Sequence, residues 1–249
     1  MTSKIADLSI IIPCFNERKN IRPMFEKLKQ IVENSPYFLE IIIIDGGSLD
    51  GSQQELIEVF KFLNKENFKL ILKNKTSGYG GDILEALSNA TANILSWTHA
   101  DLQTDPQDLI TAYEILKKNN FNDKIIVKGH RKNRQFSQFI FTFFMQIIVY
   151  IFLKKYINDI NAQPKLFSRN FYNKFLQENP PQDFSLDLFI LYFAKIKNVK
   201  IIEFPVYFAK RIYENPKGGG GFKTRIKLII RTLKYIHKIS SSKKYVIKK

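Results

Sequence analysis

The sequence predicts an α/β protein with a mainly parallel sheet and helices on both faces. Residues 8–13 and 40–45 are apolar runs of strand length without alternating polar residues, which is typical of strands buried on both faces. Segments with helical spacing of apolar residues alternate with such runs, over short connections. A chain of 249 residues is long enough for one large domain of this kind or two small ones.

The expected elements follow the first strand in order. Apolar residues at helical spacing predict a helix over residues 20–32, and the second strand ends in a turn that contains three glycines. The later helices are expected at 52–63, from the glycine-rich turn at 77–81 to about 90, and up to 118, with strands at 68–72, 93–97 and 124–128.

Polar, acidic and glycine-rich segments follow the predicted strands. The carboxyl ends of parallel strands meet at one edge of a sheet, so we expect these segments to gather there. Neither glycine-rich turn, at 46–51 or at 78–81, matches G-x-G-x-x-G after the first strand or a phosphate loop ending in Gly-Lys-Ser/Thr. The glycines by themselves therefore indicate tight turns, and Asp45 and Asp50 are also consistent with turn formation.

Residues 93–106 contain the strongest candidate for a metal site. In an extended segment, alternate side chains share one face, so His99, Asp101 and Gln103 would present one nitrogen and two oxygen ligands to a divalent cation. The alternative is a strand that ends in a capped turn, with Asp101 only solvated. Asp105 and Pro106 then predict the start of the next helix.

The charge of the chain is concentrated at its C-terminal end. The net charge is +16, and residues 210–249 contain 13 Lys or Arg and one acid. Such a segment favours an anionic partner: a membrane surface, a nucleic acid or a phosphorylated substrate. No nucleic-acid-binding module is recognised, so we expect no nucleic-acid partner. The single Cys14 excludes an internal disulfide, and the first residues do not fit a secretory signal, so we expect a cytoplasmic protein.

Six segments carry motifs of one family. They resemble P-x-x-N-E, D-D-G-S-x-D-G-[ST], a glycine-rich loop, D-A-D-L-Q, G-S-R, and E-[VI]-P-V followed by Arg. In the same order, these motifs lie at residues 12–17, 45–52, 78–81, 99–103 and 129–131, and the last lies at 203–206 with Arg211 following. Over residues 7–212 the chain therefore resembles family 2 glycosyltransferases of the Rossmann-like GT-A fold, close to dolichyl-phosphate mannose synthases and other polyprenyl-phosphate glycosyltransferases.

The resemblance implies an inverting, metal-assisted transfer of a sugar from a UDP- or GDP-sugar to a polyprenyl phosphate. It implies Mg²⁺ or Mn²⁺ at Asp101, with Gln103 and His99 nearby, and catalytic roles for Asp101 and Arg131. A cation at the diphosphate would stabilise the negative charge that the leaving group gains. The residues that the resemblance assigns to the nucleotide are Pro13, Asn16, Glu17, Asp45, Gly78 and Asp101.

Two positions depart from the family pattern. His99 stands where D-A-D has its first Asp, and Gly46 stands where D-D-G-S has its second. Losing a carboxylate weakens a site for a hard cation. His99 could ligate Mn²⁺, donate to a phosphate or be a strand residue with no role in binding.

Arg131, Lys165 and Arg211 are the expected residues of an acceptor-phosphate pocket, because a guanidinium fork suits phosphate. An acceptor phosphate is already anionic and needs little base catalysis. One alternative is transfer to a hydroxyl of a lipid-linked saccharide, which needs a general base such as Asp183 or Asp187. Another alternative is a non-catalytic membrane-bound partner, since His99 and Gly46 are compatible with lost activity.

Two further helices are expected in the second half. Residues 136–153 carry no charge and are at the lower limit of spanning length, so the apolar region 135–155 is expected to lie in the membrane interface or on the domain rather than to span. Residues 222–239 have one apolar and one basic face, which is typical of a helix on anionic lipid, although a core-packed helix has the same pattern. We therefore expect a catalytic domain at 1–212 and a basic membrane-associating tail at 213–249, peripheral at the inner membrane face.

Overall fold

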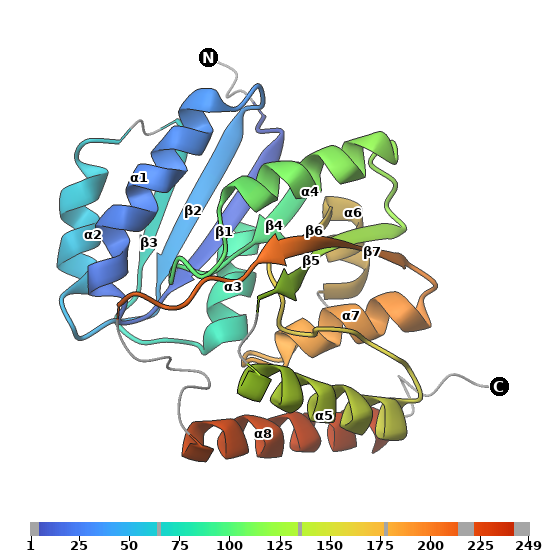
Figure 1. The fold of residues 1–249 in the computed structure, drawn as a ribbon. Helices are drawn as coiled ribbons and strands as arrows, with labels where there is room; N and C mark the ends of the chain where they lie inside the picture. Colours follow the sequence, from blue (N-terminus) through green and yellow to red (C-terminus); the bar gives the residue numbers. More distant parts are fainter. Residues whose placement is uncertain (1–4, 64–65, 134–135, 177–178, 214–221, 242–249) are drawn as a thin grey trace.

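The computed structural model describes residues 5–63, 66–133, 136–176, 179–213 and 222–241 (Figure 1). Seven strands form one sheet in the order β3-β2-β1-β4-β6-β5-β7. β1 pairs in parallel with β2 and β4, and β2 with β3. β6 is antiparallel to β4 and to β5, while β7 is parallel to β5. Six of the seven strands therefore run in one direction, and β6 alone runs against them.

The strands and helices have the following bounds. The strands are β1 Leu8–Cys14, β2 Leu39–Asp45, β3 Phe68–Leu72, β4 Ile94–Trp97, β5 Ile125–Lys132, β6 Lys165–Ser168 and β7 Lys200–Tyr207. The helices are α1 Arg18–Asn34, α2 Ser52–Phe60, α3 Tyr79–Ser88, α4 Gln107–Lys118, α5 Phe136–Leu153, α6 Arg169–Phe171, α7 Leu186–Ile196 and α8 Phe222–Ser241, with a π-helical turn at Tyr172–Leu176.

The first half agrees closely with the sequence prediction. Every predicted strand and helix up to β5 is present, with bounds that differ by a few residues. α4 begins at Gln107 rather than at Pro106, and Asp105 caps it by accepting the Gln107 N–H at 2.9 Å. β6, β7 and α7 were not predicted, because a four-residue strand and an edge strand containing Pro205 give weak sequence signals.

Each face of the sheet is covered by its own hydrophobic cluster (Figure 1). α1, α2 and α4 cover one face, where Ile10, Ile12 and Ile43 contribute from the strands. α3, α5, α7 and α8 pack on the other face, against Ile11 and Ile42. Neighbouring residues of β1 thus enter opposite cores, which is why the strand is apolar throughout.

α5 and α8 pack side by side beyond α7 (Figure 1). α8 contributes Ile236 and Ile239 to the core, so the helix is packed on the domain. α5 buries Val149 and Leu153 and exposes most of its other large side chains. Its exposed apolar residues are Phe139, Ile140, Phe143, Phe144, Ile147, Tyr150, Ile151 and Phe152. Among the described residues, no helix is both long and apolar enough to cross a membrane.

Candidate active site

Asn16 joins the loops that follow β1 and β2. Its backbone N–H donates to Ser48 Oγ at 2.7 Å, and its Oδ1 accepts the Leu49 N–H at 2.8 Å. Asn16 has a φ of 53°, in the left-handed region that Asn tolerates. Asn16 was expected to bind the nucleotide, but its side-chain oxygen holds the second loop in place.

Asp45 organises the turn at the end of β2. Its Oδ1 accepts hydrogen bonds from Gly47 N at 3.0 Å, Ser48 N at 2.9 Å and Gln53 Nε2 at 2.8 Å. The Asp45 residue is completely buried. The expectation that Asp45 contacts the nucleotide stays a prediction, while in this structure both carboxylate oxygens accept hydrogen bonds from the turn and from Gln53.

The space beside Gly46 is filled by a carboxylate from another element. A Cβ added at Gly46 would lie 2.6 Å from Asp82 Oδ2, in the first turn of α3. Asp82 is held there by Lys73 Nζ at 2.8 Å and by Thr76 Oγ1 at 2.6 Å. This arrangement gives a physical reason for the departure at Gly46, since a second Asp would clash with Asp82 and repel it.

Glu17, Asp101 and Arg211 meet at the carboxyl edge of the parallel strands. Arg211 Nη2 forms an ion pair with Glu17 Oε1 and lies 3.9 Å from Asp101 Oδ2. Burial raises the pKa of Glu17, while Arg211 opposes that shift. Residues from the start, middle and end of the chain thus form one charged junction.

The segment from His99 to Gln103 is not extended, so its geometry differs from the prediction. β4 ends at Trp97, and Leu102 has a φ of 59°. The Gln103 N–H donates to Asp101 Oδ1 at 3.2 Å, and Gln103 Nε2 donates to the Ala209 carbonyl at 3.1 Å. The expected alignment of three ligands on one strand face is therefore wrong, and the Gln103 amide instead fixes the loop to the segment after β7.

His99 lies against the ring of Tyr79, with 5.8 Å between ring centres. Burial lowers the pKa of His99, and the negative charge of Asp101 opposes that shift. The imidazole is therefore neutral at neutral pH. A neutral imidazole has a lone pair for a metal and an N–H for a phosphate oxygen, so His99 is chemically suited to either of the two binding roles named above.

Asp101 supplies a carboxylate of the kind that holds a divalent cation together with substrate oxygens and water. Among the described residues there is no group of three or more His, Cys, Asp or Glu that could hold an ion without such help. Mg²⁺ in nucleotide enzymes is usually held by one or two carboxylates together with substrate phosphates. The donor set present here matches that pattern.

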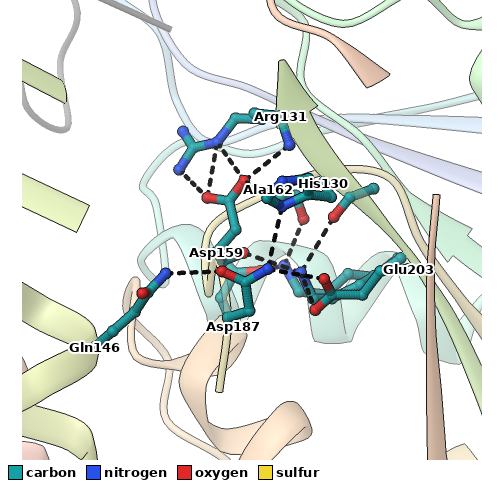
Figure 2. A network of polar contacts seen from close by, with 11 residues as sticks. His130, Arg131, Gln146, Asp159, Ala162, Asp187 and Glu203 are labelled. Atoms are coloured by element: carbon teal, nitrogen blue, oxygen red, sulfur yellow. Dashed lines mark hydrogen bonds and ion pairs between the residues drawn. The ribbon is translucent and has the colours of Figure 1, made fainter. Parts of the chain in front are cut away.

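Arg131 and Asp159 form the centre of a polar network (Figure 2). The Arg131 guanidinium contacts Asp159 Oδ1 at 3.0 Å through Nε and 2.5 Å through Nη2, and the Arg131 N–H donates to Oδ2 at 2.9 Å. Asn158 extends the network by donating to Glu203 at 2.8 Å and by accepting from Gln146 of α5 at 3.0 Å. α5 is thereby connected to the predicted acceptor side.

Lys165 is a buried partner of Asp187, not a surface cation. Its Nζ lies 2.5 Å from Asp187 Oδ1 and 3.0 Å from the Ala162 carbonyl, and the side chain is completely buried. Burial lowers the pKa of Lys165, and Asp187 opposes the shift. The expectation that Lys165 contacts the acceptor phosphate stays a prediction, and in this structure its ammonium group pairs with Asp187 instead. The same pairing removes Asp187 as an available general base.

The model of the family described as glycosyl transferase family 2 matches residues 9–176, which is more than half of the chain. The chain belongs to glycosyl transferase family 2. Among curated proteins, a dodecaprenyl-phosphate galacturonate synthase from Rhizobium johnstonii is 25% identical over 136 residues, covering 54% of this chain and 38% of that protein. A dolichyl-phosphate β-glucosyltransferase from Dictyostelium discoideum is 27% identical over 213 residues, covering 80% of this chain and 65% of that protein. The chain thus spans less than two thirds of the length of either relative.

Solved structures of glycosyltransferases share the fold. The chain matches glucosyl-3-phosphoglycerate synthase from Mycobacterium tuberculosis, solved with Mn²⁺, UDP and glucosyl-3-phosphoglycerate, at a TM-score of 0.66 and 13% identity, covering 93% of this chain and 80% of that one. A mannosyltransferase from Pyrobaculum calidifontis, solved with GDP-mannose and Mn²⁺, matches at a TM-score of 0.64 and 19% identity, covering 95% and 65%. These likenesses confirm the predicted GT-A architecture.

Sequence reasoning missed Lys128, which lies next to the predicted residue Lys165. Lys128 and Lys165 are register partners on β5 and β6, and both are completely buried. Lys128 Nζ lies 3.3 Å from Glu203 Oε1, and burial lowers its pKa to about 8. The signal for this buried charge was a lysine that directly follows the apolar residues Ile125–Val127 within a predicted strand. Because lysines are almost never fully buried without a partner, such a position predicts an acidic partner nearby.

Proposed function

We propose that this chain transfers a sugar, with inversion, from a UDP- or GDP-sugar to a polyprenyl phosphate at the inner face of a membrane. The observation that carries the proposal is the junction of Glu17, Asp101 and Arg211 at the carboxyl edge of the sheet. Family membership and the curated relatives support the same reaction class.

On the donor side, Asp101 and His99 would hold the Mg²⁺ or Mn²⁺. The bound ion would supply positive charge to the diphosphate oxygens as the glycosidic bond breaks. Arg211, which the sequence predicted for the acceptor phosphate, is held by Glu17 and is proposed here to add a cation on the donor side. Gly78, with a φ of 90° at the start of α3 and its backbone close to the Gln182 carbonyl, is a further proposed nucleotide contact. Pro13 remains a proposed nucleotide contact because its residue is only partly buried.

On the acceptor side, Arg131 is the proposed phosphate-binding residue. Asp159 fixes its guanidinium in two hydrogen bonds and leaves further N–H groups of the fork for an anion. The Asn158–Gln146 hydrogen bond links this network to α5, whose outer face is apolar. A lipid phosphate could therefore present its head to Arg131 while its chain follows an apolar surface. Lys165 contributes indirectly, by fixing Asp187.

Transfer to a hydroxyl of a lipid-linked saccharide is the second candidate. It requires a general base, and Asp183 has a side chain that is 41% exposed, beside the segment that contacts the glycine turn. Asp187 does not qualify, because Lys165 and Gln163 occupy Oδ1 and the residue is buried. The observation that favours this candidate is the exposure of the Asp183 carboxylate, which also accepts the Ser185 N–H at 2.8 Å and lies 3.5 Å from Arg231 Nε.

Turnover assays with the full-length protein test the proposal. Labelled UDP- and GDP-sugars are offered with polyprenyl phosphate or with a lipid-linked saccharide, with and without Mn²⁺, and the anomeric configuration of the product is determined by NMR. We expect product on the lipid phosphate only. Asp101→Asn should lower turnover about 100-fold or more, which is the typical effect of removing one charge-stabilising group from an active site.

Asp105→Asn is the matched control, because Asp105 is an exposed carboxylate on the same loop that caps α4. Its turnover should stay near that of the wild type. Product on the saccharide hydroxyl alone would favour the second candidate. The absence of product with every donor would overturn the enzymatic proposal and favour a non-catalytic membrane-bound partner.

A further inference from the structure

α8 reaches the active-site side of the molecule through Arg231. Ile236 and Ile239 anchor the helix in the core, and Tyr235 lies 6.5 Å from the ring of Phe189 on α7. From this fixed position, Arg231 Nε lies 3.5 Å from Asp183 Oδ2. The guanidinium carbon also lies 5.9 Å from the ring centre of Phe184. One side chain of the basic helix thus contacts two successive residues of the segment before α7.

That segment closes on the glycine turn at the start of α3. The Gly81 N–H donates to the Gln182 carbonyl at 3.0 Å. A Cβ added at Gly80 would lie 2.5 Å from the Pro181 carbonyl oxygen, and a Cβ at Gly78 would overlap the Gln182 carbonyl. The glycines are required here because two backbones are in direct contact.

A column of rings continues from this segment to the metal-binding loop. Phe184 stacks on Tyr79, with ring centres 4.5 Å apart and an angle of 10° between the planes. The other neighbour of Tyr79 is His99, at 5.8 Å between ring centres. Tyr79 is therefore held between a ring that Arg231 contacts and the imidazole proposed to face the donor diphosphate.

We infer that Arg231 is a positioning residue, which holds residues 181–184 on the glycine turn and, through Phe184 and Tyr79, sets the position of His99 for the donor. The inference rests on the proposed function, because it concerns binding of a nucleoside diphosphate. It makes α8 part of the nucleotide site as well as a basic helix on the surface.

The contribution of Arg231 is orientation rather than stability. Its side chain is 44% exposed and that of Asp183 is 41% exposed, and ion pairs at such exposed sites contribute little to folding. The planar guanidinium, however, pairs with the Asp183 carboxylate and also lies over the Phe184 ring. It therefore fixes the orientation of both side chains. Loss of Arg231 should therefore weaken ligand binding without a matching loss in melting temperature.

Trp97 provides a direct measurement of binding. It is the single Trp of the chain, it is buried at the end of β4, and Lys165 Nζ lies 5.7 Å from its ring centre. UDP and GDP, each with Mn²⁺, are titrated into the full-length protein while Trp97 fluorescence is followed. Arg231→Ala should weaken nucleotide affinity about fivefold, within the range of substitutions that act through intervening residues.

Lys234→Ala is the control, because Lys234 is exposed on the same helix and its loss changes the net charge equally. It should leave the affinity unchanged. Phe184→Leu should weaken affinity as Arg231→Ala does, and the double variant should be no worse than either, because both break one column. Arg231→Lys, which keeps the charge but not the planar fork, should restore part of the affinity.

The outcomes separate the two proposals. If the wild type binds neither nucleotide, the proposed function fails and the inference fails with it. If the wild type binds but Arg231→Ala binds equally well, the inference alone is overturned. Equal losses in Arg231→Ala and Lys234→Ala would assign the effect to net charge and would also overturn it.

Discussion

The turn after β2 and the β5–β6 region both bury charged side chains, but they stabilise them in different ways. Asp45 is surrounded by donors from its own turn and from Gln53, within eight positions of it. Lys165, by contrast, depends on Asp187, which comes from another element 22 positions away. The first charge is stabilised by local hydrogen bonds, and the second by an opposite charge.

This difference predicts different sensitivity to substitution. A turn that already supplies several donors retains most of its hydrogen bonds when a carboxylate becomes an amide. A buried ion pair loses the compensation for its remaining charge when one partner is neutralised. The β5–β6 region should therefore tolerate single changes poorly, although it contains fewer of the family motifs.

The same isosteric change at the two places gives the largest expected contrast. Asp187→Asn leaves the Lys165 ammonium buried without its anion and should lower the free energy of unfolding by about 3–5 kcal/mol. Asp45→Asn is the matched control and should cost about 1 kcal/mol, because its donors remain. Urea denaturation of both variants measures the difference. Equal losses would show that local and long-range compensation are equivalent in this fold.

A pH-dependent test of the β5–β6 region uses Lys128. Burial lowers its pKa from 10.5 to about 8, so between these values the unfolded chain binds more protons than the native state. The free energy of unfolding of the wild type should therefore rise from pH 8 to pH 10.5. Relative to Lys128→Met, which has no such proton, the rise should be about 3 kcal/mol. Denaturation curves at pH 8 and pH 10.5 measure the free energy of unfolding of both proteins. The same pH dependence in the wild type and in Lys128→Met would contradict a lowered pKa of Lys128.

The smallest expected effect concerns the outer surface formed by α5 and α8. We expect the apolar face of α5 and the basic residues of α8 to bind anionic bilayers. Replacing Lys234 and Lys238 by Gln should weaken liposome binding by about 1 kcal/mol per lysine. Sedimentation with anionic liposomes measures this, and high salt should reduce the binding of the wild type.

Lys29 of α1 and Lys118 of α4 are the matched control, because both are exposed on helices that cover the opposite face of the sheet. Their replacement by Gln should leave liposome binding unchanged. If both double variants bind equally weakly, general charge rather than an oriented surface attracts the lipid.

The sequence by itself determined the first half of this protein. Strands apolar on both faces, helical periodicity and glycine-containing turns are local signals, so the elements from β1 to β5 were predicted in order. The gathering of polar loops at one edge followed from parallel pairing, and the Glu17, Asp101 and Arg211 junction agrees with it. The segments from 12 to 103 that resemble family motifs lie in this half, where a short stretch of chain specifies each turn.

Only the tertiary structure decided how those residues are used. Asn16 and Asp45 hold loops in this structure through hydrogen bonds with Ser48, Leu49 and Gln53, which the motifs did not indicate. The pairing of Lys165 with Asp187 depends on the antiparallel strand β6, and a strand of four residues is too short to be predicted from the sequence. Contact of Arg231 with Phe184 depends on how α8 packs against α7. Such contacts join residues distant in sequence, and their energies depend on burial and on neighbouring charge, which a local pattern does not specify.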